Sequence, residues 1–112
     1  MPIIPISILY EKVWVYVDSG AVYSIFHVRT ANRLRIDIKQ GRLQMIVVGD
    51  GSYIPTYFHD LTLRIGEFEV TAPIGFSERL GVGFNILGRK GIFDQFQVCF
   101  NDHIRKVTFQ KI

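Results

Sequence analysis

The stretch Val13-Trp14-Val15-Tyr16-Val17-Asp18-Ser19-Gly20-Ala21 carries the strongest structural signal in the chain. Its five consecutive apolar residues are β-branched or aromatic, which predicts a strand buried on both faces. The run then ends in a carboxylate, which is costly to remove from water unless another group uses it. Gly20 permits a tight turn and the close approach of a second backbone. The stretch therefore predicts one acid, Asp18, at the edge of the core with room beside it for a partner.

The composition is typical of one folded domain over residues 1–112. Hydrophobic residues make up 48% of the chain and charged residues 21%, which argues against disorder. The net charge of +3 is a mild basic excess that does not require a nucleic-acid partner. A single cysteine excludes an internal disulfide and fits a reducing compartment. No apolar run is long enough to span a membrane, so we expect a cytoplasmic protein without a membrane partner.

Short apolar runs separated by turn residues predict an all-β fold. We expect strands over residues 6–10, 13–17, 22–26, 43–48, 53–58, 61–65, 68–72, 84–87, 98–100 and 104–109, with residues 74–76 extending the seventh. Glu11-Lys12 is the expected first turn, and residues 36–39 form a brief alternating piece. Helical spacing predicts one short helix within residues 27–34 and a second over Ile92, Phe93 and Phe96.

The tetrad Asp18-Ser19-Gly20-Ala21 resembles the Asp-Ser/Thr-Gly-Ala signature of the aspartic proteases, in particular the single-lobe retropepsin-like family. Ile86-Leu87-Gly88-Arg89 is similar to the second signature of that family, two apolar residues followed by Gly and often Arg. A Gly-rich hairpin over residues 47–57 lies where the family has its flap. The resemblance covers nearly the whole chain and is closer to cellular and prokaryotic members than to the viral enzymes. It implies a small closed acid-protease-type β-barrel with one or two short helices and a flap hairpin.

The same resemblance implies an aspartic endopeptidase that works as a homodimer on an extended peptide or protein substrate. In such an enzyme one carboxylate takes a proton from water while a neutral carboxylic acid polarises the scissile carbonyl. This chain has one such motif, so each subunit would supply one Asp18 across a two-fold axis. Neither a cofactor nor a metal is implied.

The resemblance also implies roles for individual residues. Ser19 would hydrogen-bond across the axis, and Gly20 would let the two carboxyl groups approach, so the catalytic set is Asp18, Ser19 and Gly20. The hairpin tip would close over an extended substrate, and the substrate-binding set is Ala21, Val22, Gly49, Asp50, Gly51, Ser52 and Ile86. Pocket residues could include Val22, Ile46, Tyr53, Ile54 and Ile86. Gly88 would pack behind the catalytic loop, and Arg89 would be structural.

Two departures from the family pattern motivate an alternative function. Val22 stands where the retroviral members usually have an acid that pairs with the later arginine, so Arg89 must find another partner. The final segment, residues 97–110, is longer than in the viral enzymes. The alternative is a non-catalytic module with the same fold that binds peptides or partner proteins.

A third hypothesis is a small β-barrel that binds nucleic acid. Arg29, Arg33, Arg35, Lys39 and Arg42 form a basic run, and Tyr53, Tyr57 and Phe58 could stack on bases. Such a run is more often a solvated face, so we expect no nucleic-acid partner. The three histidines lack metal-ligand spacing, so no metal site is expected. Cys99, within an apolar strand, is expected to be buried.

Overall fold

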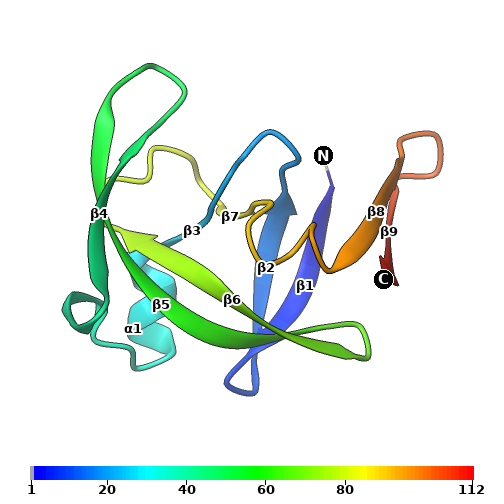
Figure 1. The fold of residues 1–112 in the computed structure, drawn as a ribbon, viewed down its shortest axis with the longest axis horizontal. Helices are drawn as coiled ribbons and strands as arrows, with labels where there is room; N and C mark the ends of the chain where they lie inside the picture. Colours follow the sequence, from blue (N-terminus) through cyan, green and yellow to red (C-terminus); the bar gives the residue numbers. More distant parts are fainter. Residues whose placement is uncertain (1) are drawn as a thin grey trace.

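A ring of six strands forms the body of the computed structural model, which describes residues 2–112 (Figure 1). The strands and helices are β1 (Ile3–Ile8), β2 (Glu11–Val17), β3 (Ser24–His27), α1 (Val28–Arg33), the 3₁₀-helix η1 (Ile38–Gln40), β4 (Arg42–Val47), β5 (Tyr53–Ile65), β6 (Phe68–Ser77), β7 (Asn85–Leu87), β8 (Phe96–Asn101) and β9 (Lys106–Lys111). The all-β prediction with one or two short helices is confirmed. No helix within residues 2–112 has the length and apolar character needed to cross a bilayer.

The sheet closes on itself through a pairing between its first and fifth strands. Its hydrogen-bonded order is β1-β2-β7-β3-β6-β5-β4, and β1 also pairs with β5 at Ser7–Arg64 and Ile8–Leu63. Two pairings are parallel, β2 with β7 and β3 with β6. The barrel interior is filled by one contiguous cluster of aliphatic and aromatic side chains that includes Val15, Phe26 and Phe76. The predicted closed barrel is therefore confirmed, and β4 extends the sheet beyond it as a free edge.

Strand β2 is buried on one face only, so the prediction of burial on both faces is wrong. Val13, Val15 and Val17 point into the barrel and are almost fully buried, whereas Trp14 is 56% exposed and Tyr16 is half-buried. A barrel strand alternates between the interior and the outside. In the part of the chain that the structure describes, no second sheet covers the outside of β2, so its aromatic residues lie at the surface.

The first turn is formed by Leu9 and Tyr10, and not by Glu11-Lys12 as predicted. Ile8 pairs directly with Glu11, and both turn residues have positive φ, 50° for Leu9 and 67° for Tyr10. This is the type I′ geometry that a two-residue hairpin favours, because its twist matches that of the strands. The residues that normally allow such a turn are Asn and Gly, so Leu-Tyr carries no recognisable turn signal.

Several predicted strands are joined or changed in the structure. Residues 53–58 and 61–65 belong to one thirteen-residue strand, β5, which pairs from Tyr57 to Ile65 with the ten-residue β6 across the turn at Gly66. The alternating piece at 36–39 ends in a 3₁₀-helix. The helix predicted from Ile92 to Phe96 is absent: residues 91–95 form successive turns, because Gly91 has a positive φ of 77° and Phe96 already begins β8. The helix predicted within residues 27–34 is confirmed as α1.

Strands β8 and β9 form a separate two-stranded sheet. Phe96 is buried in the barrel core, and Val98, Val107 and Phe109 pack against that core. The opposite face of β8 is turned to solvent, so Cys99 is exposed and the prediction of its burial is wrong. Alternation along β8 places Cys99 with the exposed Gln97.

Candidate active site

Asp18 directly follows β2, where the chain leaves the barrel in a tight loop. Its N–H donates to the Leu87 carbonyl at 3.0 Å, which extends the β2–β7 ladder one residue past the strand. The Gly20 N–H donates to Asp18 Oδ1 at 2.9 Å, and the Ala21 N–H donates to the Asp18 carbonyl at 3.2 Å. The loop thus turns back on the half-buried carboxyl group and holds one of its oxygens.

Gly88 lies directly against the same loop. A Cβ at this position would be 2.3 Å from the Tyr23 carbonyl oxygen and 2.9 Å from that of Ala21, so no other residue fits without moving the backbone. The Gly88 N–H donates to the buried hydroxyl of Ser24 at 2.9 Å. The end of β7 and the loop therefore pack backbone against backbone, with one buried hydroxyl between them.

Arg89 is tied to the Asp18 loop by main chain and side chain. Its N–H donates to the Ala21 carbonyl at 2.9 Å, and its Nη1 donates to the Ser19 carbonyl at 3.3 Å. The guanidinium also lies over the Phe93 ring, 4.9 Å from the centroid. A backbone carbonyl and an aromatic ring are thus the partners of this arginine in a chain that has Val22 after the tetrad.

The β4–β5 hairpin projects on the same side of the molecule as the Asp18 loop (Figure 1). Its tip is closed by its own residues: the Gly51 N–H donates to the Val48 carbonyl at 2.8 Å, and Asp50 accepts from both the hydroxyl and the N–H of Ser52. These two hydrogen bonds, the hydroxyl first, lower the pKa of Asp50 from its ordinary value of 3.8. Gly51, with φ of 85°, supplies the left-handed residue of the turn.

Asp18 is not paired with a cation within residues 2–112. The ion pairs in this part of the chain join Arg42 to Asp60 and Arg64 to Glu69, both at the surface. No group of three or more His, Cys, Asp and Glu side chains that could hold a metal ion occurs in the same residues. Each chain therefore presents a single carboxyl group at this loop.

Comparison with solved structures shows which fold this is. EIAV protease in complex with the inhibitor HBY-793 aligns with a TM-score of 0.63 and 22% identity over 79% of this chain and 81% of its own. The retroviral protease-like domain of Ddi1 from Leishmania major aligns with a TM-score of 0.67 and 22% identity over 100% and 90%. A retropepsin-like aspartic protease from Rickettsia conorii aligns with a TM-score of 0.71 and 16% identity over 88% and 75%. The chain has the retropepsin-like fold. No protein-family model and no curated protein matches the sequence.

Within the retropepsin-like fold of this chain, the predicted substrate-binding residues fall into two groups. One group lies next to Asp18: Val22 is exposed, while Ala21 and Ile86 are half-buried. The other group is the tip of the β4–β5 hairpin, namely Gly49, Asp50, Gly51 and Ser52. The Asp18 loop and the β4–β5 hairpin, which carry most of these residues, project on the same side of the molecule (Figure 1).

The predicted pocket residues of the β4–β5 hairpin lie on two opposite faces of that hairpin. Ile46 pairs with Ile54 and shares its face with Gln44, whose Nε2 donates to the Tyr23 hydroxyl at 3.4 Å. Tyr53 pairs with Val47 on the opposite face. Since side chains alternate along a strand, Ile46 and Ile54 face the barrel side of the hairpin, and Tyr53 faces away from them.

Two residues of the site were missed from the sequence. Ser24 supplies the buried hydroxyl that accepts the Gly88 N–H. The Tyr23 ring lies against that of Phe58 in a tilted arrangement, 5.0 Å between centroids, and its hydroxyl accepts from Gln44 of the hairpin, so it connects the Asp18 loop to the hairpin base. The sequence offered one signal for Ser24, which is a lone serine within the apolar run of residues 22–26. A serine buried in such a run needs a hydrogen-bond partner, so it could have been predicted to hold a neighbouring backbone group.

Proposed function

We propose that this protein is an aspartic endopeptidase that works as a homodimer, with Asp18 of each subunit as half of the catalytic pair. The observation that carries the proposal is the Asp18 loop itself. Its half-buried carboxyl group is held by the Gly20 N–H, is free of any cation within residues 2–112, and stands at the end of a barrel strand in the retropepsin-like fold. The two-acid mechanism needs a second carboxyl group, which a second copy of the chain would supply.

The proposed chemistry follows from bringing two such acids together. Two carboxyl groups in contact cannot both ionise, so the pair holds one proton and titrates as a unit. The ionised member takes a proton from water as the water oxygen attacks the peptide carbonyl carbon, while the protonated member hydrogen-bonds the carbonyl oxygen. Ser19 and Gly20 are proposed to hold the two loops at the distance that this sharing needs.

The second copy is proposed to meet the side of the molecule that carries the Asp18 loop. Figure 1 shows the β4–β5 hairpin, the Asp18 loop, the start of β1 and the β8–β9 turn projecting along this one side. The two-stranded β8–β9 sheet packs one face on the barrel core through Phe96, Val98 and Phe109, and its turn extends beyond that contact. Its exposed apolar residues, Phe100 at 40% and Ile104 at 58%, support its use in the subunit contact.

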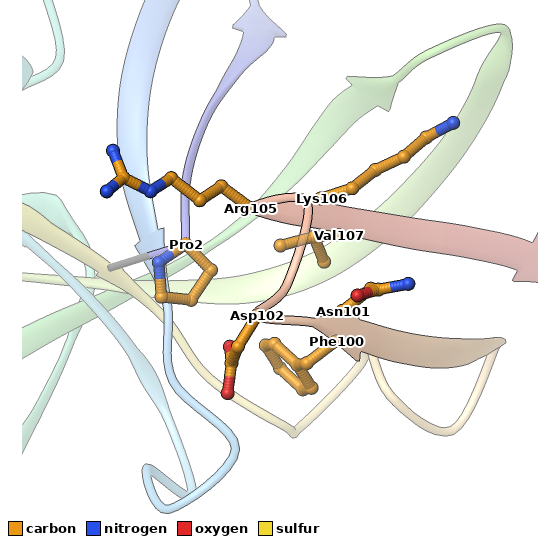
Figure 2. A pocket seen from close by; sticks show the side chains of 7 residues that line it. All are labelled: Pro2, Phe100, Asn101, Asp102, Arg105, Lys106 and Val107. Atoms are coloured by element: carbon orange, nitrogen blue, oxygen red, sulfur yellow. The ribbon is translucent and has the colours of Figure 1, made fainter.

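A groove of about 350 Å³ between Pro2 and the β8–β9 hairpin lies in the same region. Phe100 and Val107 pair across the hairpin and form its apolar wall, and Figure 2 shows Arg105 reaching toward Pro2 while Lys106 extends the other way. An apolar surface with charged residues at its margin is the composition expected of a subunit interface.

The deciding experiment compares the protein with its Asp18→Asn variant. We expect the unaltered protein to cleave peptides at acidic pH with a rate profile bounded by two apparent pKa values, because only the singly protonated pair is active. Asp18→Asn keeps the shape of the side chain and removes the acid, so cleavage should be lost while circular dichroism and sedimentation stay unchanged. Cleavage at the same rate by the variant would refute the role of Asp18.

The alternative is a module with this fold that binds peptides or partner proteins without cleaving them. Two observations favour this alternative. Val22 stands where the retroviral proteases usually have an acid, and Arg89 donates to the Ser19 carbonyl instead of to a carboxylate. Sedimentation separates the two functions, because a chain that stays monomeric at high concentration has one carboxyl group per site. Such a chain can bind a peptide but cannot run the two-acid mechanism.

A further inference from the structure

A pocket of about 390 Å³ lies on the outside of the barrel between β2, α1 and the segment before β7. Its walls are the rings of Trp14 and Phe84 and the basic side chains of Arg29, Arg33 and His27. Among residues 2–112, no acidic residue lines it. A pocket of this size holds one or two side chains and combines apolar rings with positive charge.

The base of the pocket is a closed hydrogen-bond network. Asn85 Oδ1 accepts the His27 N–H at 2.9 Å, and Asn85 Nδ2 donates to the Thr30 hydroxyl at 3.0 Å. His27 Nε2 meets the Val82 carbonyl oxygen at 2.6 Å. Because each of these polar groups has a partner in the network, the base does not need a ligand to complete it.

The two guanidinium groups at the rim have spare hydrogen-bond donors. Arg33 Nη2 donates to the Lys12 carbonyl at 2.7 Å, which leaves its other donors free. Arg29 is in no side-chain hydrogen bond or ion pair within residues 2–112. The acidic partners of Arg42 and Arg64 are Asp60 and Glu69, and neither acid lines the pocket.

The pocket lies on the same face of β2 as Asp18. Val13, Val15 and Val17 point inward, so alternation places Trp14, Tyr16 and Asp18 together on the other face. Tyr16 lies between Trp14 and Asp18 on this face, and its ring contacts the ring of Phe84 in the pocket wall, 5.1 Å between centroids. Four residues of strand separate Trp14 from Asp18, about 13 Å, which an extended peptide covers in about four residues.

The edge of β2 is also open beside the pocket. Strand β7 pairs with β2 only from Val15 to Val17, so no strand of residues 2–112 pairs with Glu11 to Trp14 on that side. At this edge the Lys12 carbonyl oxygen already accepts a hydrogen bond from the Arg33 side chain. The free main-chain groups next to Trp14 are suited to an extended peptide that adds beside them.

We propose that this pocket binds an acidic residue of an extended peptide, with the carboxylate on Arg29 and Arg33 and the aliphatic stem on Trp14. The planar fork of a guanidinium matches a carboxylate, and the indole ring covers the apolar part of the side chain. Where the peptide is also the substrate, the pocket selects an acid about four residues from the bond that is cleaved. That second statement rests on the proposed function, and the binding itself does not.

Nucleic acid is the less suitable occupant. A single strand needs a track of cations along its backbone with aromatic platforms between them. Of the basic run only Arg29 and Arg33 reach the pocket, and Arg42 is paired with Asp60 at the base of the hairpin. The site is a compact positive pocket and not a positive groove.

The test uses Trp14, the only tryptophan of the chain, as the reporter. The full chain carrying Asp18→Asn, which prevents cleavage, is titrated with an extended peptide containing glutamate and with the same peptide containing glutamine. We expect a saturable change in Trp14 fluorescence with affinity roughly tenfold higher for the glutamate peptide, as for a charge-assisted hydrogen-bonded pair. Equal affinity for the two peptides, or no binding of either, would overturn the proposal.

Matched variants locate the binding. Arg29→Glu reverses the charge at a residue without side-chain partners, so it should keep the fold and abolish the preference for glutamate. Arg79→Glu makes the same change at an exposed arginine that does not line the pocket and should leave the affinity unchanged. An oligonucleotide that binds more tightly than the glutamate peptide and is also lost in Arg29→Glu would assign the pocket to nucleic acid instead.

A separate measurement distinguishes this proposal from the proposed function. Unaltered protein that binds the glutamate peptide in the pocket but cleaves no peptide refutes the protease and leaves the pocket standing. Protein that cleaves glutamate and glutamine substrates equally, and whose Asp18→Asn form binds them equally, refutes the pocket and leaves the protease standing.

Discussion

Tyr10 is the residue at which one substitution should make this protein more stable. It is fully exposed, with a relative surface area of 104%, and sits in the β1–β2 turn with φ of 67°. A non-glycine residue in the left-handed region carries about 1–2 kcal/mol of steric strain, because its Cβ approaches the following carbonyl oxygen. Tyr10→Gly removes that strain without removing a buried contact.

The size of the effect follows from two opposing terms. Relief of strain adds about 1–2 kcal/mol to the free energy of unfolding, and the greater freedom of glycine in the unfolded chain subtracts about 0.5–1 kcal/mol. The two ranges leave a net gain between about 0 and 1.5 kcal/mol, centred near about 0.75 kcal/mol, so for an m-value of about 2 kcal/mol per molar in urea the midpoint should rise by roughly 0.4 M.

The assay is equilibrium urea unfolding at one fixed protein concentration, because association with a second copy would change the apparent stability. Tyr53→Gly is the matched control, since Tyr53 is 62% exposed at the start of β5 and has no positive φ. There the same substitution should lower stability, because glycine weakens a strand. A Tyr10→Gly midpoint that is unchanged or lower, at an unchanged m-value, would refute the strain argument.

Two further substitutions test the loop packing and the hairpin tip. Gly88→Ala places a Cβ 2.3 Å from the Tyr23 carbonyl oxygen and should lower the free energy of unfolding by about 1–3 kcal/mol, measured by urea unfolding, whereas Gly49→Ala, with nothing within 4 Å, should change it by less than about 0.5 kcal/mol. Ser52→Ala should raise the pKa of Asp50 toward 3.8, measured by NMR titration of the carboxyl carbon, because the hydroxyl is the largest cause of its lowering. Because the pKa of Asp50 is lowered in the folded protein, its ionised form stabilises the fold above the unfolded pKa, and this stabilisation is lost as the pH falls through the folded pKa. In Ser52→Ala the decrease in the free energy of unfolding over this acidic range should be smaller. An Asp50 pKa that does not move would contradict the assigned hydrogen bond.

Most of the strands and the candidate acid could be predicted because their signals are local. Alternation of apolar and polar residues marks β6 from Phe68 onward, and the run into Asp18 marks the end of β2. The Gly49–Ser52 turn was also predicted, since glycine and a capping aspartate determine its geometry within four residues. The first turn was misplaced because Leu9 and Tyr10 have no turn preference, and the pairing of the strands on either side holds them in place.

Local patterns alone predicted most of the strands, the single acid at the end of an apolar run, and the two short signatures around Asp18 and Gly88. Contacts between distant parts of the chain became apparent only in the folded molecule. The closure of β1 on β5, the hydroxyl of Ser24 under Gly88, and the outward face of β2 that carries Trp14 near Arg33 are of this kind. Alternation states which residues share a face, but the closing of the barrel decides which face becomes the interior and what lies beside the other.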